Sequence, residues 1–309
     1  WKKSVSIDDL NGFSEAELSK VREGDEYVVS LQIPVYIDLM TYAENRGLRE
    51  EVYRAYISRA SDVGITPVKF DNRKVMDEIL KLRSEMSILL GLSNYAEYSV
   101  QSKMVDSPES VIDFLEKLVD LSHFQATSEL KDLEAFAGHE LMPWDLMFYS
   151  EKLKQNVFNF KSADLKPYFP ESSVLSGLFE TIQNLYSVTL TEVQEDCYHP
   201  DVRVIMLEDE DGPIGKIYFD VYARENKRGG AWMSDFQGLY KDSLPVAFVV
   251  CNLNSPKDGK PALFDFDEIV TIFHEFGHAL HHLLTKVTFP CAAGISGVPW
   301  DGVELPSQY

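Results

Sequence analysis

The sequence predicts a mainly α-helical protein with a small β-sheet, divided into a helical region and a region that contains the sheet. Three observations support this class. Apolar residues recur at helical spacing through the first two thirds of the 309-residue chain. Runs rich in β-branched and aromatic residues begin at about residue 200. The pattern His-Glu-x-x-His then lies inside a strongly apolar helical stretch near the end of the chain.

Helical periodicity dominates residues 1–199, which we expect to form one domain. Four segments carry this periodicity, with clusters of Pro, Gly and Asn between them: residues 34–60, 71–91, 107–137 and 172–187. No internal repeat and no low-complexity linker interrupts the series. The sequence therefore predicts a helical array in this part of the chain.

Residues 200–309 are expected to form a second domain that contains the sheet. VRVIML and PIGKIYFDVYA are joined by EDEDG, which predicts a β-hairpin with Asp211-Gly212 at its turn. PVAFVVCNLN predicts a third strand. We expect Val246–Leu253 to contribute an exposed edge that pairs with an extended peptide, with Val249 and Cys251 among the substrate-binding residues. A strand paired on both sides explains the run AFVV equally well.

The stretch FDFDEIVTIFHEFGHALHHLLTK predicts an amphipathic helix over about residues 265–286. Asp265 and Glu268 have the spacing of a capping box at its start. Apolar residues recur along it at helical spacing, namely Ile269, Ile272, Phe273, Phe276, Leu280, Leu283 and Leu284. The His-Glu-x-x-His pattern is thereby predicted to lie on a regular helix rather than on a loop.

His274 and His278 are four residues apart, so their imidazoles project from one face of this helix and can reach one metal ion. Glu275 lies one position further round the helix, where a general base for a metal-bound water is needed. A helix with polar residues on its exposed face is the alternative. It fits poorly, because these three residues interrupt an otherwise apolar helix.

Catalytic zinc usually takes three protein ligands plus water, so one more ligand must come from elsewhere. We predict Glu304, which follows a Gly- and Pro-rich connection able to bring a second helix back against the first. Asp301, Asp267 and Glu268 compete with it on spacing alone, and Glu304 could instead cap a helix that begins near Asp301. Cys291 is a weaker candidate for a soft ligand, since no second cysteine accompanies it.

The connection between these segments contains Gly294 and Gly297, which we predict to line the site because glycine lets a backbone approach a substrate closely. A tight connection explains them nearly as well. His281 and His282 follow the motif but have no expected ligand role. Residues 227–230, Lys-Arg-Gly-Gly, lack the complete phosphate-binding pattern and predict an ordinary loop.

Composition limits the classes of partner. A net charge of −21 argues against nucleic acid and against anionic membranes, because both attract basic surfaces. No run reaches the eighteen or more apolar residues of a transmembrane helix, and no secretory signal opens the chain. The cysteines Cys197, Cys251 and Cys291 are widely separated and predict reduced thiols in a cytosol-like compartment.

HEFGHALHHLL followed by GISGVPWDGVELPSQ resembles the thimet oligopeptidase family of zinc metallopeptidases, in particular its bacterial and plant organellar members. The resemblance extends through IPVYIDLMTYAENRGLREEVYRAYISRAS, HPDVRV, FDVYARENKRGGAW and CNLNSPKDGKPALF. It implies a zincin-like, neurolysin-type fold with two lobes and a deep substrate channel, of which residues 1–199 form one wall. It also implies that His274, His278 and Glu304 bind one Zn²⁺ and that Glu275 is the catalytic base.

The expected function is that of a zinc-dependent endopeptidase that hydrolyses short peptides through a metal-activated water. A zinc aminopeptidase shares the motif, but the sequence has no Gly-x-Met-Glu-Asn pattern for a free amine. Because family members continue beyond the position of Tyr309 and this chain opens on Trp1, we expect a piece of a longer protein. A peptide-binding fragment without catalysis is the second alternative. We expect a monomer in the cytoplasm or, in a plant, in the mitochondrion or chloroplast.

Overall fold

The computed structural model describes the chain apart from residues 65–69, 161–163, 225–226, 242, 254 and 257–260. The chain divides into two compact units. The first comprises residues 1–101 and 107–160, and the second comprises residues 102–106 and 161–309. The division therefore lies near residue 160 rather than at residue 199 as predicted, and the segment in between belongs with the region that contains the predicted sheet.

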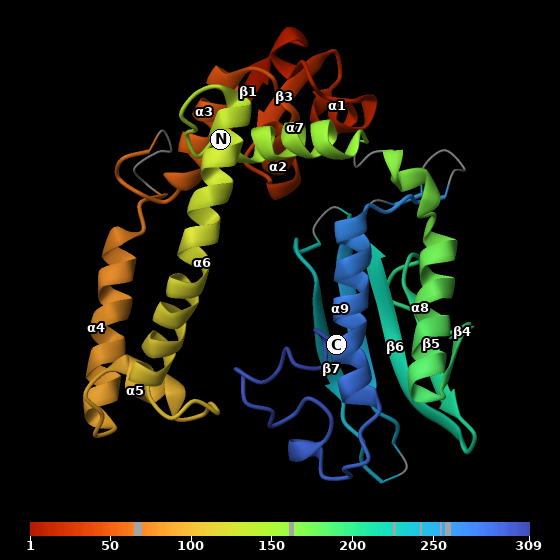
Figure 1. The fold of residues 1–309 in the computed structure, drawn as a ribbon. Helices are drawn as coiled ribbons and strands as arrows, with labels where there is room; N and C mark the ends of the chain where they lie inside the picture. Colours follow the sequence, from red (N-terminus) through yellow and green to blue (C-terminus); the bar gives the residue numbers. More distant parts are fainter. Residues whose placement is uncertain (65–69, 161–163, 225–226, 242, 254, 257–260) are drawn as a thin grey trace. The chain divides into compact units, whose positions relative to one another are not determined.

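The first unit is mainly helical, as predicted, and also contains a three-stranded antiparallel sheet that the sequence analysis missed. Its strands have the order β1-β3-β2 and are β1 (Lys2–Val5), β2 (Arg22–Glu23) and β3 (Glu26–Ser30). Its helices are α1 (Glu15–Val21), α2 (Ile33–Tyr42), α3 (Arg46–Ile57), α4 (Arg73–Leu89), α5 (Tyr95–Val100), α6 (Pro108–Ala137) and α7 (Leu146–Phe158), shown in Figure 1.

Local caps explain where α3 and α6 begin. The predicted segment 34–60 is split into α2 and α3 because Asn45 caps α3, its side chain accepting a hydrogen bond from the Leu48 amide at 3.1 Å. Ser107 caps α6 in the same way, and Gly138, with φ of 79°, ends it. The segments predicted at 71–91 and 107–137 correspond to α4 and α6.

The second unit is built on a five-stranded mixed sheet with the order β4-β5-β6-β8-β7. Its strands are β4 (Thr189–Val193), β5 (Arg203–Asp209), β6 (Gly212–Tyr222), β7 (Trp232–Gln237) and β8 (Val246–Leu253). The predicted hairpin is confirmed, since β5 and β6 pair antiparallel and Gly212 adopts φ of 119° at the turn. β8 runs parallel to β6 and antiparallel to β7.

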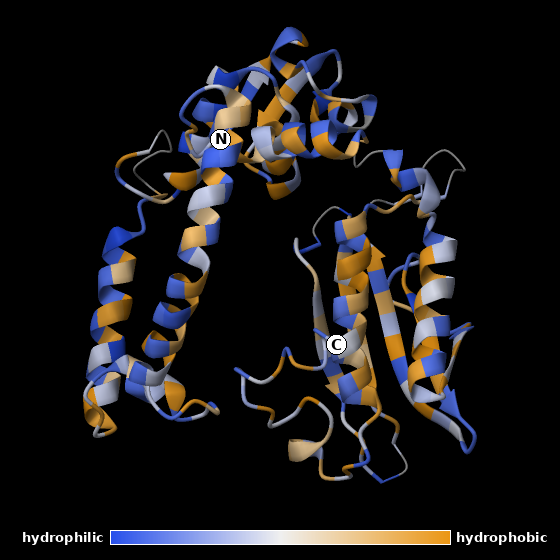
Figure 2. Cartoon of the chain, viewed as in Figure 1, coloured by the Kyte–Doolittle hydropathy of each residue, from blue (hydrophilic) through white to orange (hydrophobic). Residues whose placement is uncertain are grey.

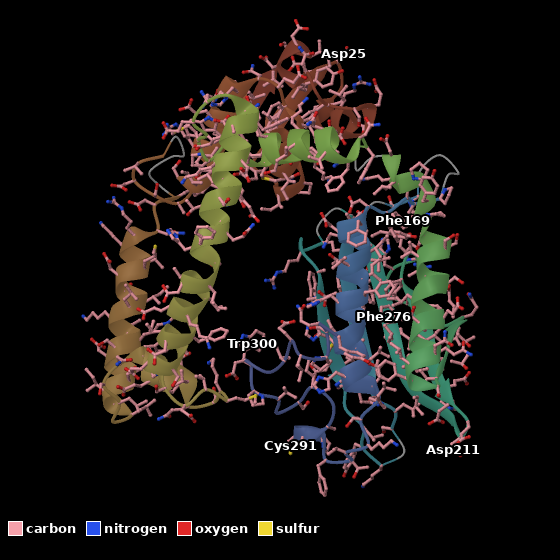
Figure 3. All side chains as sticks on the ribbon, in the orientation of Figure 1. Asp25, Phe169, Asp211, Phe276, Cys291 and Trp300 are labelled. Carbon is pink, nitrogen blue, oxygen red and sulfur yellow. The ribbon has the colours of Figure 1, made fainter. Side chains whose placement is uncertain are left out.

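Helices α8 (Glu171–Tyr186) and α9 (Phe266–Leu283) share one apolar core with this sheet. Phe276 of α9 stands at its centre, 5.4 Å from the ring of Phe219 on β6 and 6.2 Å from the ring of Phe179 on α8. Figure 2 shows the apolar stripe along α9, and Figure 3 labels Phe276 between the helix and the sheet. Among the residues described, no helix is both long and apolar enough to cross a membrane.

The predicted edge strand is not at the edge. β8 lies between β6 and β7, so the alternative of a strand paired on both sides is correct. The side chains of Val249 and Cys251 are fully buried in the core, and neither can contact a substrate there. Burial raises the pKa of the Cys251 thiol to about 12. The edge of the sheet beside α9 is formed by β7, whose residues 234–237 are exposed.

Candidate metal centre

Helix α9 begins where its sequence predicts, with Asp265 as its cap. The Asp265 side chain accepts a hydrogen bond from the Glu268 amide, and the Glu268 carboxylate accepts one from the Asp265 amide, both at 2.9 Å. This reciprocal capping box fixes the first turn of α9 and engages the Glu268 carboxylate. It removes Glu268 as a competitor for the third ligand. The helix ends at Leu283, three residues before the predicted end.

Two imidazoles and one carboxylate converge in front of α9. The Nε2 atoms of His274 and His278 each lie 3.1 Å from Oε2 of Glu304. One candidate donor atom from each of the three residues lies within 4.8 Å of the others, and among the described residues this is the group that could hold a metal ion. The imidazole planes are nearly perpendicular, at 89°. The three predicted ligands are therefore neighbours in the structure.

The donor set fits zinc. Zn–N and Zn–O bonds are about 2.0–2.2 Å long, so two donors on one tetrahedral ion lie roughly 3.3 Å apart. The 3.1 Å separations from Glu304 Oε2 to both imidazoles are close to this value. Three protein donors with a fourth position left for water form the pattern of a catalytic rather than a structural zinc site. The same donors also accept other divalent ions.

Glu304 lies on a turn rather than on the second helix that we expected, because residues 300–307 form successive turns. Its carboxylate Oε2 accepts a hydrogen bond of 2.8 Å from the Ser307 hydroxyl. This bond lowers the pKa of Glu304; burial opposes the shift, and the neighbouring histidines add to it. The ionised form of Glu304, which is the form that binds metal, is thereby favoured.

Burial raises the pKa of a carboxyl group but lowers the pKa of a histidine. It lowers the pKa of His278, and the adjacent His274 lowers it further, although the nearby Glu304 carboxylate works against both. The neutral imidazole is therefore favoured, as a metal ligand requires. Together with the ionised Glu304, this gives the protonation states of a metal-binding set.

Glu275 lies beside these donors and is nearly buried, with 7 % of its surface exposed. Burial raises the pKa of its carboxyl group, and the negative charge of Glu304 adds to the rise. The charge of His274 and a hydrogen bond from the main-chain amide of Met233, on the edge strand β7, both lower it. A partly desolvated carboxylate, held by a main-chain amide next to the donors, is suited to accept a proton.

The remaining competitors are occupied elsewhere or exposed. The Asp301 carboxylate accepts hydrogen bonds from the amides of Met104 at 3.0 Å and Val105 at 3.1 Å, so it anchors its own segment. Asp267 and Cys291 are exposed, and neither belongs to the donor group found among the described residues. Of the proposed alternatives, only Glu304 is placed with both histidines.

Internal packing accounts for the two glycines of the connecting loop. Gly294 and Gly297 adopt φ of 61° and 77°, which disfavours other residues. A Cβ atom on Gly294 would lie 2.6 Å from Nδ1 of His282, and one on Gly297 would lie 2.8 Å from the carbonyl of Cys291. The close approaches therefore involve the protein itself. Contact of either glycine with a substrate stays a prediction.

Sequence reasoning missed three residues around the site. His282 is fully buried, and its Nε2 bonds the carbonyl of Gln237 at the end of β7, 2.9 Å away. Ser307 holds the Glu304 carboxylate. Gly277 lets Ser307 lie against α9, since a Cβ atom there would be 2.6 Å from the Ser307 Cα. A glycine inside a helix costs about 1 kcal/mol, which is the signal that could have identified it.

Comparison with known proteins shows which family this chain belongs to. A model of Peptidase family M3 matches residues 39–309, and the chain belongs to this family. It is 47% identical to oligopeptidase A of Escherichia coli over its whole length, which covers 48% of that protein. It is 40% identical over 97% of its length to the organellar, chloroplastic/mitochondrial oligopeptidase A of Arabidopsis thaliana, covering 40% of that relative.

A further relative is dipeptidyl carboxypeptidase of Escherichia coli, 32% identical over 98% of this chain and 46% of the relative. The chain thus spans about half the length of the curated relatives that it matches. These similarities confirm the family resemblance inferred from the motifs and support a metallopeptidase.

Proposed function

We propose that this protein provides the zinc centre of an endopeptidase that hydrolyses short peptides. The observation that carries the proposal is the convergence of His274, His278 and Glu304, with two 3.1 Å separations, beside the nearly buried Glu275. Membership of Peptidase family M3 supports the choice of peptides as substrates.

Each residue has a distinct role in this proposal. His274, His278 and Glu304 hold one Zn²⁺. When bound, zinc supplies Lewis-acid activation of water and of the scissile carbonyl. Glu275 accepts the proton of the attacking water and later delivers it to the leaving amine. The amide of Met233 keeps the Glu275 carboxylate beside the edge strand.

The edge strand also gives the substrate a place to bind. An extended peptide can add to a free sheet edge through main-chain hydrogen bonds, which hold it whatever its side chains are. The sequence analysis assigned this role to Val246–Leu253. The sheet order instead supports β7, which is exposed at residues 234–237 and reaches Glu275 through Met233. We propose that the substrate backbone pairs with β7.

Family membership supports the remaining features of the proposal. We infer a neurolysin-type zincin fold with two lobes around a deep channel, and a monomeric state. We propose a cytoplasmic location, or an organellar one in a plant, as for the chloroplastic/mitochondrial relative of Arabidopsis thaliana. Sedimentation of the purified protein tests the monomer, and a hexamer or dimer at micromolar concentration would contradict it.

The first experiment measures metal content before and after chelation, in parallel with cleavage of an internally quenched peptide blocked at both ends. One zinc per chain with chelator-sensitive cleavage supports the whole proposal. Zinc without cleavage, together with binding of a non-cleavable peptide, would leave a peptide-binding module. Absence of zinc would refute the ligand set.

The relative named dipeptidyl carboxypeptidase makes release of C-terminal dipeptides a second candidate function. The two activities differ in their need for a free C-terminus. Matched peptides, blocked at either end or at neither, separate them: an endopeptidase cuts all of these, whereas a dipeptidyl carboxypeptidase cuts only those with a free C-terminus. An aminopeptidase would cut only those with a free N-terminus.

A further inference from the structure

Gly277 forms a gap in the side-chain surface of α9 directly below the turn that carries Glu304. A Cβ atom built on Gly277 would lie 2.6 Å from the Cα of Ser307, 2.9 Å from the Pro306 carbonyl oxygen and 3.3 Å from the Ser307 amide nitrogen. All three atoms belong to backbone, which cannot rotate away. Any side chain at this position must therefore push the turn outward.

Ser307 occupies the space that this gap provides. It is 9 % exposed, and its hydroxyl lies 2.8 Å from both the main-chain carbonyl oxygen and the carboxylate Oε2 of Glu304. Oε2 is the atom that lies 3.1 Å from the Nε2 atoms of both His274 and His278. One hydroxyl thus touches the carboxylate oxygen at which the donor set converges.

The Glu304 side chain needs such support because it is 59% exposed. An exposed glutamate samples several rotamers, and fixing it in one of them costs conformational entropy. The hydrogen bond from Ser307, already formed in the protein, offsets part of this cost before a metal ion binds. Hydrogen-bonding partners of metal ligands typically change metal affinity by about 10–100-fold when they are removed.

We propose that Ser307 and Gly277 are positioning residues of the metal centre. Gly277 lets the turn lie against α9, and the Ser307 hydroxyl holds Glu304 Oε2 where it meets both imidazoles. The inference rests on the proposed zinc site and deepens it. It predicts that Ser307 affects zinc only through Glu304, whereas Gly277 affects it by displacing the turn.

The test is the zinc dissociation constant of the purified chain, measured by competition with a chromophoric chelator. Ser307→Ala is expected to raise it by about 10–100-fold, and Gly277→Ala by at least about 10-fold. Ser296→Ala is the matched hydroxyl control, since Ser296 lies on the same connection and its hydroxyl makes no hydrogen bond among the residues that the structure describes. Gly177→Ala is the matched helical glycine, with no atom within 4 Å of its added Cβ. Both controls should leave zinc affinity unchanged.

A second measurement separates positioning from general stability. In a Glu304→Ala background, Ser307→Ala should have no further effect on zinc affinity, because the ligand it positions is gone. An equal loss in both backgrounds would refute the role through Glu304. The Co²⁺-substituted protein should show an altered visible spectrum in Ser307→Ala, while far-ultraviolet circular dichroism of the metal-free form stays unchanged.

The possible failures are distinguishable. If the unaltered chain binds no zinc, the proposed metal centre is wrong and this inference falls with it. If the unaltered chain binds zinc and Ser307→Ala binds it within twofold as tightly, only the role of Ser307 is wrong. If Gly277→Ala matches Gly177→Ala, the role of Gly277 is wrong.

Discussion

Asp220→Asn tests how the second unit holds the connection that leads into β7. The buried Asp220 carboxylate accepts hydrogen bonds from Arg224 at 2.6 and 2.8 Å, from Lys227 at 2.8 Å and from the Tyr198 hydroxyl at 2.9 Å. Lys227 also donates to the carbonyls of Asp220 and Tyr222. Asparagine keeps the shape of the side chain and removes the charge that these two cations face.

The magnitude follows from the pKa of Asp220. Burial alone would raise it, but the hydrogen bonds from Arg224 and Lys227 outweigh burial and lower it to about 2. An unfolded aspartate titrates near 3.9, so the difference of about two units corresponds to roughly 2.5 kcal/mol of stability. Because the folded pKa is depressed, this stability is complete above about pH 5 and is lost as the pH falls towards 2. About half remains at pH 3.

We therefore expect Asp220→Asn to lower the free energy of unfolding by about 2–3 kcal/mol at pH 7 and by only about half as much at pH 3. Urea unfolding at both pH values measures this, and hydrogen exchange in β6 and β8 assigns the loss to the second unit. Asp196→Asn, at an exposed position, is the control and should change stability little. An equal loss at both pH values, or no loss, would refute the electrostatic reasoning.

Three further predictions concern the site. Glu275→Gln should retain one zinc per chain and reduce turnover by about 10²–10⁴-fold in the active enzyme, because only the base is lost; substantial residual hydrolysis would remove Glu275 from that role. Glu304→Ala should lower zinc content under the same conditions, and full occupancy would place the third ligand elsewhere. His282→Phe should lower the melting temperature of the metal-free protein, corresponding to about 1–3 kcal/mol, because the Gln237 carbonyl loses its buried partner. His282→Gln, which can still donate, should lose less, and equal losses would show that the bond does not matter.

The sequence predicted those features that depend on neighbours along the chain. The capping box of Asp265 and Glu268 and the turn at Asp211-Gly212 are local patterns, and both are present. β7 was missed because its sequence, WMSDFQ, places polar residues on an exposed edge and shows little of the apolar run of a strand. The neighbours of β8 depend on pairing between distant segments, which the run AFVV does not reveal.

The same distinction holds within the site. His274 and His278 share a helix face by periodicity alone, so their approach was predictable. Glu304 reaches them from a turn, and spacing could not distinguish it from Asp301, whose carboxylate binds the amides of Met104 and Val105 instead. Ser307 shows no signal in the sequence, because its role exists only once the turn has folded back onto α9.

The two positions written as x in His-Glu-x-x-His are not free to vary in the motif HEFGH of this chain. Successive residues of a helix turn by about 100°, so Glu275 and Gly277 lie on opposite sides of the histidine pair and Phe276 points away from it. Glu275 faces the Met233 amide of β7, Phe276 fills the core against Phe219, and the bare Gly277 faces Ser307. Truncating Phe276 would cost about 3–5 kcal/mol of stability, whereas a methyl group on Gly277 would displace the turn that carries Glu304. The three positions between the two histidines are therefore each constrained by a different neighbour, and exchanging Phe276 and Gly277 would disrupt both the core and the proposed zinc centre.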